Sequence, residues 1–362
     1  MRGIVYTGEK AELSQAVEVR APGPTEVVVR TVAAGVCHSD VSVLDGTITW
    51  PAPSILGHEG AGVVEEVGDE VTTVTPGDHV VVATLANCGM CRWCNTGRPT
   101  WCRQSIGNMA QPFTVDGEPA WNFAATSSFA ERTVVQQIQA VPISKDVPLE
   151  SACLIACGVL TGVGAVLNRA RVEPGQTAAV FGVGGVGLNV IQALRLSQAS
   201  RIVAVDTVAS KQALAMEFGA TDFVDASTTD AVEAMRALLP GVQLFKGGGV
   251  DWSFECVGHP VVLRNAIDVL DWGGTCVAVG VPPPTAEVSV PVTHLTHVDR
   301  GLIGSRYGSA RPQHDIPVLV DLYLRGQLKL DELVSRTYPL EQFDAVLADM
   351  REGVLARGVL TF

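Results

Sequence analysis

Two patterns of apolar positions divide the chain. From about residue 3 to 150, short alternating or fully apolar runs are separated by Gly and Pro, for example at 26–36 (EVVVRTVAAGV), 61–68 (AGVVEEVG) and 77–84 (GDHVVVAT). Such runs between turn residues are typical of β-strands. This part of the chain therefore predicts a compact, barrel-like β domain.

From about residue 170 the pattern changes to alternating strands and helices. Apolar runs of β type recur at 177–184, 201–206, 221–226, 250–258, 274–281 and 301–306. Segments with helical periodicity separate the first five runs, whereas the last connection, at 282–300, is rich in Pro and predicts no helix. This alternation predicts a parallel, doubly wound sheet with helices on both faces.

The C-terminal segment predicts two helices, at 317–327 and 342–353, and a final strand at 356–362. We expect this segment to return to the N-terminal domain. The predicted fold class is therefore α/β plus β. The predicted domains are residues 1–158 together with 307–362, and residues 159–306.

Composition excludes several classes of protein. Hydrophobic residues make up 47% and charged residues 17% of the chain, which is enough apolar material for more than one core and excludes a disordered chain. The formal net charge is −13, so nucleic acid and membrane surfaces are poor candidate partners. The first residues lack the apolar stretch typical of a signal peptide, and no segment offers the run of about 18 apolar residues that a membrane span needs. We therefore expect a cytoplasmic protein.

Three glycines in the spacing G-x-G-x-x-G, Gly182, Gly184 and Gly187, follow an apolar run and open a predicted helix. In this context the first glycine permits a tight turn, the second lets the backbone approach a pyrophosphate, and the third allows close helix–strand packing. The phosphates would lie at the helix N-terminus. The alternative is a turn that only packs a helix. The strand, the helix and a following acidic residue together favour a dinucleotide site.

Asp206 is that acidic residue, at the end of the next predicted strand. A carboxylate there accepts hydrogen bonds from an adenosine ribose and repels a 2′-phosphate, which favours NAD over NADP. Lys211 is close enough in sequence to reach the same ribose. The cofactor-binding residues predicted in this half of the chain are Gly182, Gly184, Gly185, Val186, Gly187, Asp206, Lys211, Val279, Val281 and Tyr307.

Four of the nine cysteines, Cys88, Cys91, Cys94 and Cys102, crowd into one loop that is rich in turn residues. Four thiolates at this spacing can form a closed tetrahedral shell around Zn²⁺, which leaves no position for a substrate. Iron–sulfur and redox-disulfide alternatives are disfavoured by the spacing and by the expected compartment. The loop therefore predicts a structural zinc site.

Cys37, His58 and Cys157 are further potential metal ligands, and a catalytic zinc needs three protein ligands and an open fourth position. Each residue taken alone also fits an ordinary role, as a buried thiol or a histidine in a turn. Because the three residues lie far apart in the sequence, spacing alone does not join them.

Motifs along nearly the whole chain resemble those of the zinc-containing medium-chain alcohol dehydrogenases. They are GVCHSD at 35–40, G-H-E-x2-G-x5-G-x2-V at 57–71, the four-cysteine loop, CLIACG at 153–158 and GVGGVG at 182–187. The resemblance implies a GroES-like catalytic domain, a Rossmann coenzyme domain, two zinc ions and NAD. It also implies reversible hydride transfer between a primary alcohol and NAD, with zinc as the Lewis acid.

The resemblance also assigns roles to single residues. It implies that Cys37, His58 and Cys157 hold the catalytic zinc, with Glu59 as an occasional ligand and Asp40 orienting the ligand histidine. Ser39 matches the hydroxyl that contacts the substrate oxygen and starts a proton relay. His38 and Arg357 match residues that contact the cofactor pyrophosphate. Many relatives carry a histidine where this chain has Ser42, so the end of the relay stays unassigned.

The substrate pocket implied by the resemblance contains Ile48, Trp50, Thr84, Val281 and Arg306. Its apolar members suit an apolar, aromatic or allylic primary alcohol. One rival function is a thiol-dependent formaldehyde dehydrogenase, for which Arg306 or Arg103 would hold a carboxylate. A second rival, a non-catalytic nucleotide-binding protein, is disfavoured because all three zinc ligands are present. We expect a homodimer or homotetramer.

Overall fold

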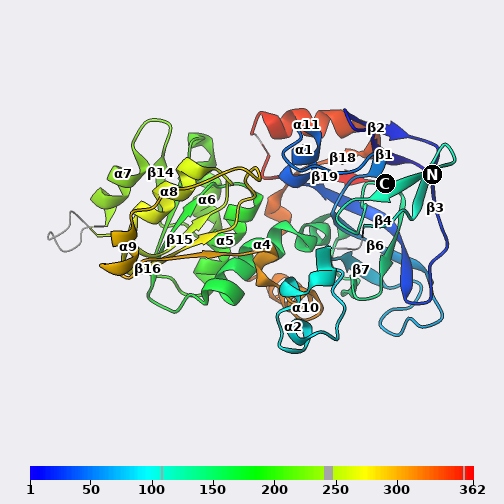
Figure 1. The fold of residues 1–362 in the computed structure, drawn as a ribbon, viewed down its shortest axis with the longest axis horizontal. Coiled ribbons are helices and arrows are strands. Elements are labelled where there is room, and N and C mark those ends of the chain that lie inside the picture. The colour runs from blue at the N-terminus through cyan, green and yellow to red at the C-terminus, as the bar shows by residue number, and fades with distance from the viewer. Residues whose placement is uncertain (107–108, 240–247, 354) are drawn as a thin grey trace. The chain divides into compact units, whose positions relative to one another are not determined.

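The computed structural model describes residues 1–106, 109–239, 248–353 and 355–362. These residues form two units, Met1–Leu160 together with Ala310–Phe362, and Thr161–Ser309. Figure 1 shows a unit built mainly of strands and a unit in which helices flank a sheet. The predicted fold class, α/β plus β, is confirmed.

The first unit contains two sheets. One has the order β2-β1-β5-β9-β8-β3, and the other has the order β11-β7-β6-β4-β19-β18, with β10 paired to β4. The strands are β1 (Gly3–Tyr6), β2 (Ala11–Ser14), β3 (Val17–Val19), β4 (Glu26–Val36), β5 (Ser54–Ile55), β6 (Glu59–Val67), β7 (His79–Val82), β8 (Phe113–Val115), β9 (Glu118–Asn122), β10 (Arg132–Gln136), β11 (Ala140–Pro142), β18 (Val334–Pro339) and β19 (Arg357–Thr361).

The long strand β4 organises the second of these sheets. It pairs antiparallel with β6, with Gly35 opposite Glu59, and with the C-terminal strand β19, with Val36 opposite Gly358. The expected return of the C-terminal segment to the N-terminal domain is therefore correct. Because β4 and β6 lie side by side, the residue after β4, Cys37, and the residue before β6, His58, lie at the same end of the sheet.

Helices and short turns complete this unit. The helices are α1 (His38–Leu44), α2 (Arg92–Asn95), α3 (Leu149–Ala152), α10 (Pro312–Leu324) and α11 (Phe343–Arg351), while α4 (Gly158–Gly164) continues into the second unit. The 3₁₀ turns are η1 (Pro99–Trp101), η2 (Arg103–Ile106), η3 (Cys153–Ala156), η8 (Asp331–Leu333) and η9 (Leu340–Gln342). Among the described residues, no single helix has both the length and the apolar character needed to cross a membrane, and only the bent pair Leu149–Ala156 with Gly158–Ala170 passes by length and composition.

The second unit is the predicted parallel sheet. Its strand order, β14-β13-β12-β15-β16-β17, is that of a doubly wound dinucleotide-binding fold, in which all strands are parallel and the order in which successive strands are added reverses between β12 and β15. The strands are β12 (Thr177–Phe181), β13 (Arg201–Asp206), β14 (Asp222–Asp225), β15 (Val250–Glu255), β16 (Leu270–Ala278) and β17 (Gly301–Gly304). Ligands bind such sheets at the carboxyl ends of the strands, near that reversal.

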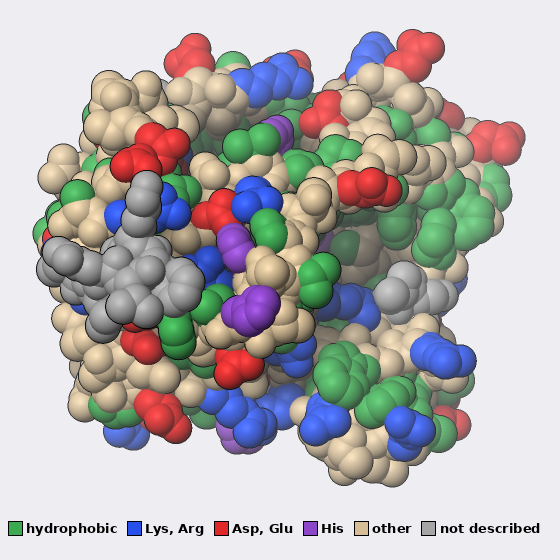
Figure 2. All heavy atoms as spheres, turned by 60° about the vertical axis from the view of Figure 1, so that its left-hand side comes forward, with side chains coloured by type: hydrophobic (Ala, Val, Ile, Leu, Met, Phe, Trp, Pro, Cys, Tyr) green, Lys and Arg blue, Asp and Glu red, His purple; other side chains and the backbone are tan. Residues whose placement is uncertain are grey.

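The helices of this unit follow the predicted segments, with one correction. They are the π-helix η4 (Ala165–Ala170), α5 (Gly185–Leu196), α6 (Gln212–Phe218), α7 (Ala231–Leu238), α8 (Pro260–Asp268) and α9 (Val292–Thr296), with 3₁₀ turns η5 (Ala209–Lys211) and η7 (Tyr307–Ser309). No helix was expected at 282–300, yet α9 forms there, because Pro291 precedes its first turn rather than interrupting it. On the face drawn in Figure 2, acidic and basic side chains both occur.

Gly57, which directly precedes His58, lies in a tightly packed part of the first unit, where a side chain would not fit. Its φ is +93°, and a Cβ there would lie 2.5 Å from the backbone N of Phe129. Gly57→Ala is expected to lower the free energy of unfolding by about 2–5 kcal/mol, since left-handed strain and overpacking add. The matched control, Gly77→Ala, has φ +92° and nothing within 4 Å, so strain alone should cost about 1–2 kcal/mol. Urea unfolding of both variants checks this, and equal losses would contradict it.

Candidate functional site

Four potential metal ligands converge in the first unit. Cys37 follows β4, His58 and Glu59 lie at the start of β6, and Cys157 lies between η3 and α4. The ligand atoms of these four side chains all lie within 4.8 Å of one another. The structure thus brings together the three ligands that the resemblance implied for a catalytic zinc, and the occasional ligand beside them.

Asp40 fixes the orientation of His58. Its fully buried carboxylate accepts hydrogen bonds from the backbone N–H of Cys37 (3.0 Å) and of Gly57 (3.2 Å), and lies 3.1 Å from His58 Nδ1. The carboxylate therefore joins the end of β4 to the start of β6. Because Nδ1 is engaged, Nε2 is the nitrogen that faces the ligand group, and it is buried without a hydrogen-bond partner among the described residues.

Glu59 and Arg357 form a buried pair next to this group. Glu59 Oε1 accepts hydrogen bonds from the backbone N–H of Gly158 (3.0 Å) and from Arg357 Nη2 (3.4 Å). Arg357 is 5% exposed, and its Nη2 also lies 4.0 Å from Cys37 Sγ. Burial raises the pKa of Glu59 to about 7, although the Arg357 charge opposes this shift. The guanidinium thus neutralises part of the negative charge of the ligand group.

The donor set suits zinc. The Cys37 thiol, hydrogen-bonded to the Cys157 thiol, has a pKa well below its ordinary value, and the same contact raises the pKa of Cys157. Burial lowers the pKa of His58, but the Asp40 carboxylate and Cys37 together outweigh burial and raise this pKa. Glu59 Oε2, like the imidazole Nε2, is buried and without a partner among the described residues. Two sulfurs and one free imidazole nitrogen match the three protein ligands of a catalytic zinc.

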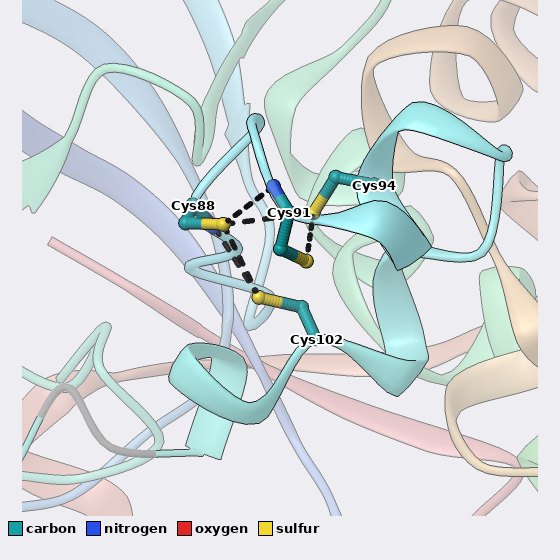
Figure 3. Close-up of side chains that lie close together, drawn as sticks. All are labelled: Cys88, Cys91, Cys94 and Cys102. Carbon is teal, nitrogen blue, oxygen red and sulfur yellow. Dashed lines mark hydrogen bonds between the residues drawn. The ribbon is translucent and has the colours of Figure 1, made fainter.

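The four-cysteine loop forms the second ligand group. The sulfurs of Cys88, Cys91, Cys94 and Cys102 lie within 4.8 Å of one another and point toward a common centre (Figure 3). Cys88 Sγ accepts the backbone N–H of Cys91 (3.3 Å). Hydrogen bonding, mainly from the backbone at Cys94, lowers the pKa of Cys91 to about 6, which favours the thiolate that binds metal. The arrangement fits a closed Cys₄ zinc site.

Cys94→Ser is expected to remove one zinc per chain and to destabilise the first unit. Loss of a structural metal is among the mutations that destabilise a protein most. Here we expect the free energy of unfolding to fall by more than about 3 kcal/mol, which lowers the thermal midpoint by about 6–12 °C. Zinc content and thermal unfolding measure both effects. The control Cys276→Ala removes a buried thiol in β16 of the other unit and should keep all of the zinc. Unchanged zinc content in Cys94→Ser would rule out the metal assignment of this loop.

The structure of the glycine-rich segment between β12 and α5 explains why glycine occupies each position of the motif. Gly182 has φ +91°, and a Cβ on Gly187 would lie 1.8 Å from the Gly182 carbonyl oxygen. A Cβ on Gly184 would meet nothing within 4 Å, so the backbone there borders open space. Gly185 and Val186 form the first turn of α5. A tight turn, open space and close packing are the three features that a pyrophosphate-binding turn requires.

Asp206 lies at the end of β13 and faces this turn. Its carboxylate accepts hydrogen bonds from the backbone N–H of Val183 (2.7 Å) and of Val208 (3.0 Å). Lys211 Nζ lies 3.0 Å from the same carboxylate. The carboxylate therefore ties the glycine turn to β13 and holds Lys211 beside it.

The other predicted site residues lie in both units. In the first, His38 is exposed and Ser39 partly exposed on the first turn of α1, Ile48 and Trp50 follow that helix, and Thr84 follows β7. In the second, Val279 and Val281 follow β16, Val281 being 60% exposed, and Arg306 and Tyr307 follow β17. The roles predicted for these residues stay predictions.

Sequence reasoning missed Phe123. Its ring lies edge-on to His58, with centroids 5.6 Å apart, and edge-on to Trp50, at 5.1 Å. It also missed the contact of Arg357 with Glu59. Neither contact leaves a spacing signal, because each joins segments that are distant in the sequence.

Two family models match the chain. The model described as "Alcohol dehydrogenase GroES-like domain" matches residues 23–145, and the one described as "Zinc-binding dehydrogenase" matches residues 185–325. The first contains Cys37, His58, Glu59 and the four-cysteine loop, and the second begins at Gly185, the first residue of α5.

Individual proteins resemble the chain over nearly its full length. A putative alcohol dehydrogenase D of Mycobacterium tuberculosis (strain CDC 1551 / Oshkosh) is 40% identical over 98% of this chain and 96% of its own. An S-(hydroxymethyl)glutathione dehydrogenase of Paracoccus denitrificans is 37% identical over 96% of each. The crystal structure of benzyl alcohol dehydrogenase from Acinetobacter calcoaceticus is 33% identical, with a TM-score of 0.92 over 100% of this chain and 99% of the other.

Proposed function

Because the chain belongs to the zinc-containing medium-chain alcohol dehydrogenases, we propose that it oxidises free primary alcohols to aldehydes, reversibly, with NAD as the hydride acceptor. Members of this family are oxidoreductases that act on CH–OH groups, and their cofactors are zinc and NAD. The observation that carries the proposal is the convergence of Cys37, His58 and Cys157 on one point, where the buried His58 Nε2 has no hydrogen-bond partner in the described part of the chain.

We assign the catalytic zinc to Cys37 Sγ, His58 Nε2 and Cys157 Sγ, with Glu59 as an occasional fourth ligand. When bound, zinc would act as a Lewis acid that polarises an oxygen atom, and NAD would serve as the hydride acceptor. Asp40 holds the imidazole in the tautomer that presents Nε2, since its carboxylate lies at Nδ1. Arg357 offsets the charge of two thiolates and a carboxylate in a buried site.

Residues on and near α1 are assigned to proton transfer from the substrate and to binding of the cofactor pyrophosphate. The Ser39 hydroxyl contacts the substrate oxygen and passes its proton onward. Ser42, one turn later on α1, is no base near neutral pH, so the relay ends at water or at another group. His38, exposed on the same turn, and Arg357 contact the cofactor pyrophosphate in this proposal.

The second unit is assigned to the coenzyme, and the first to catalysis. The open space at Gly184 and the N-terminus of α5 support a pyrophosphate site. Asp206 supports NAD over NADP, because its carboxylate would repel a 2′-phosphate. Val279, Val281 and Tyr307 complete the proposed coenzyme site.

For the substrate we propose an apolar, aromatic or allylic primary alcohol. Trp50 and Phe123 form an aromatic pair, and Phe123 in turn contacts the His58 ring, so the metal ligand has an aromatic neighbour. Ile48 is half-buried next to the same cluster as Trp50. Thr84, Val281 and Arg306 are the other proposed pocket residues.

A second candidate is oxidation of a hydroxymethyl-thiol adduct. The observation that favours it is the similarity to S-(hydroxymethyl)glutathione dehydrogenases, which are 35–37% identical to this chain. Such an adduct carries carboxylates, for which Arg306 or Arg103 would supply the positive charge.

Initial rates of NADH formation separate the two candidates. Benzylic, allylic and short aliphatic alcohols would be compared with formaldehyde, each with and without glutathione. Turnover of the free alcohols, abolished by a chelator, is expected. Turnover of formaldehyde only in the presence of the thiol would instead establish the adduct reaction.

We also propose a homodimer or homotetramer that works in the cytoplasm. A reducing compartment keeps the six zinc-binding thiols of the two sites from forming disulfides.

A further inference from the structure

The segment Phe123–Ser128, which we call the hydroxyl loop, is strained, and its buried residues are Phe123 and three residues with hydroxyl groups, Thr126, Ser127 and Ser128. Ala124, Ala125 and Ser127 have φ values of +50°, +58° and +52°, a region that side chains with a Cβ rarely adopt. Thr126 and Ser127 are buried, at 1% and 0% exposure. Strain of this kind persists only where surrounding contacts fix it, and it occurs preferentially at functional sites.

Two hydroxyl groups tie this loop to the segment that carries His58. Ser127 Oγ donates to the carbonyl oxygen of Ile55 (2.8 Å) and accepts the backbone N–H of Phe123 (2.9 Å). Thr126 Oγ1 lies 3.1 Å from the carbonyl oxygen of Gly57. The backbone adds a further bond, from Ser128 N–H to the same Gly57 carbonyl (3.0 Å). The hydroxyl loop therefore holds Gly57, the residue before His58, in place.

Ser127 also fixes the position of Phe123, because it accepts that residue's backbone N–H. The Phe123 ring lies at 82° to the His58 ring, so it supports the imidazole from the side. Asp40 engages His58 at Nδ1, and the Phe123 edge contacts the imidazole at a second place. Together the two contacts restrict rotation about the His58 Cβ–Cγ bond, which sets the plane of the ring.

We propose that Ser127 is a positioning residue for the catalytic metal site: through Ile55 and Phe123 it fixes the plane of the His58 imidazole so that Nε2 stays directed at Cys37 and Cys157. The inference rests on the proposed zinc at this group. Partners that orient a ligand histidine typically change metal affinity by about 10–100-fold.

Zinc release from the purified full-length protein tests the proposal without reference to activity. Release would be followed with a chromogenic chelator under native conditions, and the four-cysteine site serves as an internal reference in the same molecule. In Ser127→Ala, one of the two zinc ions should leave about 10–100-fold faster, and the other at the wild-type rate. With Co²⁺ in the catalytic site, the visible absorption bands should shift in Ser127→Ala, because ligand geometry changes.

Ser128→Ala is the matched control. Ser128 is the next residue, equally buried, and its Oγ has no hydrogen-bond partner among the described residues, so its loss should leave zinc release unchanged. Phe123→Leu keeps an apolar side chain but removes the aromatic edge, and should accelerate release of the same zinc. If Ser127→Ala does not fold, Ser127→Gly lacks the hydroxyl but adopts the positive φ without strain.

Three results would overturn the inference. Equal release from wild type and from folded Ser127 variants would overturn it alone, as would equal acceleration in Ser128→Ala. A wild-type protein that holds only one zinc per chain would overturn the proposed function first, and the inference with it.

Discussion

Replacing Cys157 with alanine should lower kcat/KM for a primary alcohol by about 10³-fold or more and remove one of the two zinc ions. The metal contributes several kcal/mol to stabilising charge in the transition state, and each 1.36 kcal/mol corresponds to a factor of ten. Cys157 Sγ belongs to the group whose ligand atoms lie within 4.8 Å. Without it, Cys37 and His58 supply only two of the three ligands that a catalytic zinc requires.

The control for this variant is Cys153→Ala, four residues earlier. Cys153 is fully buried, and its thiol donates to the carbonyl oxygen of Glu150 (3.1 Å), outside the ligand group. It should keep two zinc ions and near wild-type kcat/KM, at a modest loss of stability. Zinc analysis and initial rates on the same samples check both expectations. Retained activity in a folded Cys157→Ala protein with one zinc would remove Cys157 from the catalytic site.

The second large effect is expected at Asp206. In Asp206→Asn, the ratio of kcat/KM with NAD to that with NADP should fall by about 10²-fold or more, since like-charge contacts cost several kcal/mol. The amide oxygen still accepts the Val183 N–H, so the glycine turn keeps its anchor. In the wild-type protein, Lys211 Nζ lies 3.0 Å from the Asp206 carboxylate. In the variant this ammonium group becomes available to a 2′-phosphate.

Asp225→Asn is the matched control for the coenzyme. Asp225 ends β14 directly opposite Asp206 in the sheet register, yet it accepts hydrogen bonds from Ser227 rather than from the glycine turn. Its loss should leave the coenzyme ratio unchanged. An unchanged ratio in Asp206→Asn, or an equal change in Asp225→Asn, would contradict the role assigned to Asp206.

The fold was largely predictable because its signals are local. Apolar runs punctuated by Gly and Pro indicated the strands of the first unit, and the 2- and 3.6-residue periods indicated the order of strands and helices in the second. The helix at Val292–Thr296 was missed because it is short and follows a Pro-rich stretch. Five residues carry too little periodicity to be recognised, whatever their environment.

The candidate site was predictable only where a motif is compact. The four cysteines and the glycine turn each lie within one short segment, so spacing alone indicated their chemistry. Cys37, His58 and Cys157 were joined only through the family resemblance. The pairing of β4 with β6 and the position of η3 belong to the tertiary structure, which the spacing of residues in the sequence does not show. The support of His58 by Phe123, and of Glu59 by Arg357, depends on side-chain packing that no spacing records.

The central claim is that this chain oxidises a free alcohol with a zinc held by Cys37, His58 and Cys157. The most direct test is the initial rate of NADH formation from benzyl alcohol, with zinc content measured on the same sample during stepwise chelation. The account predicts saturable turnover by protein with two zinc ions per chain, which falls in proportion to the loss of the catalytic zinc. Full turnover after that zinc has left, or no turnover of free alcohols by protein that holds both zinc ions and binds NAD, would contradict it.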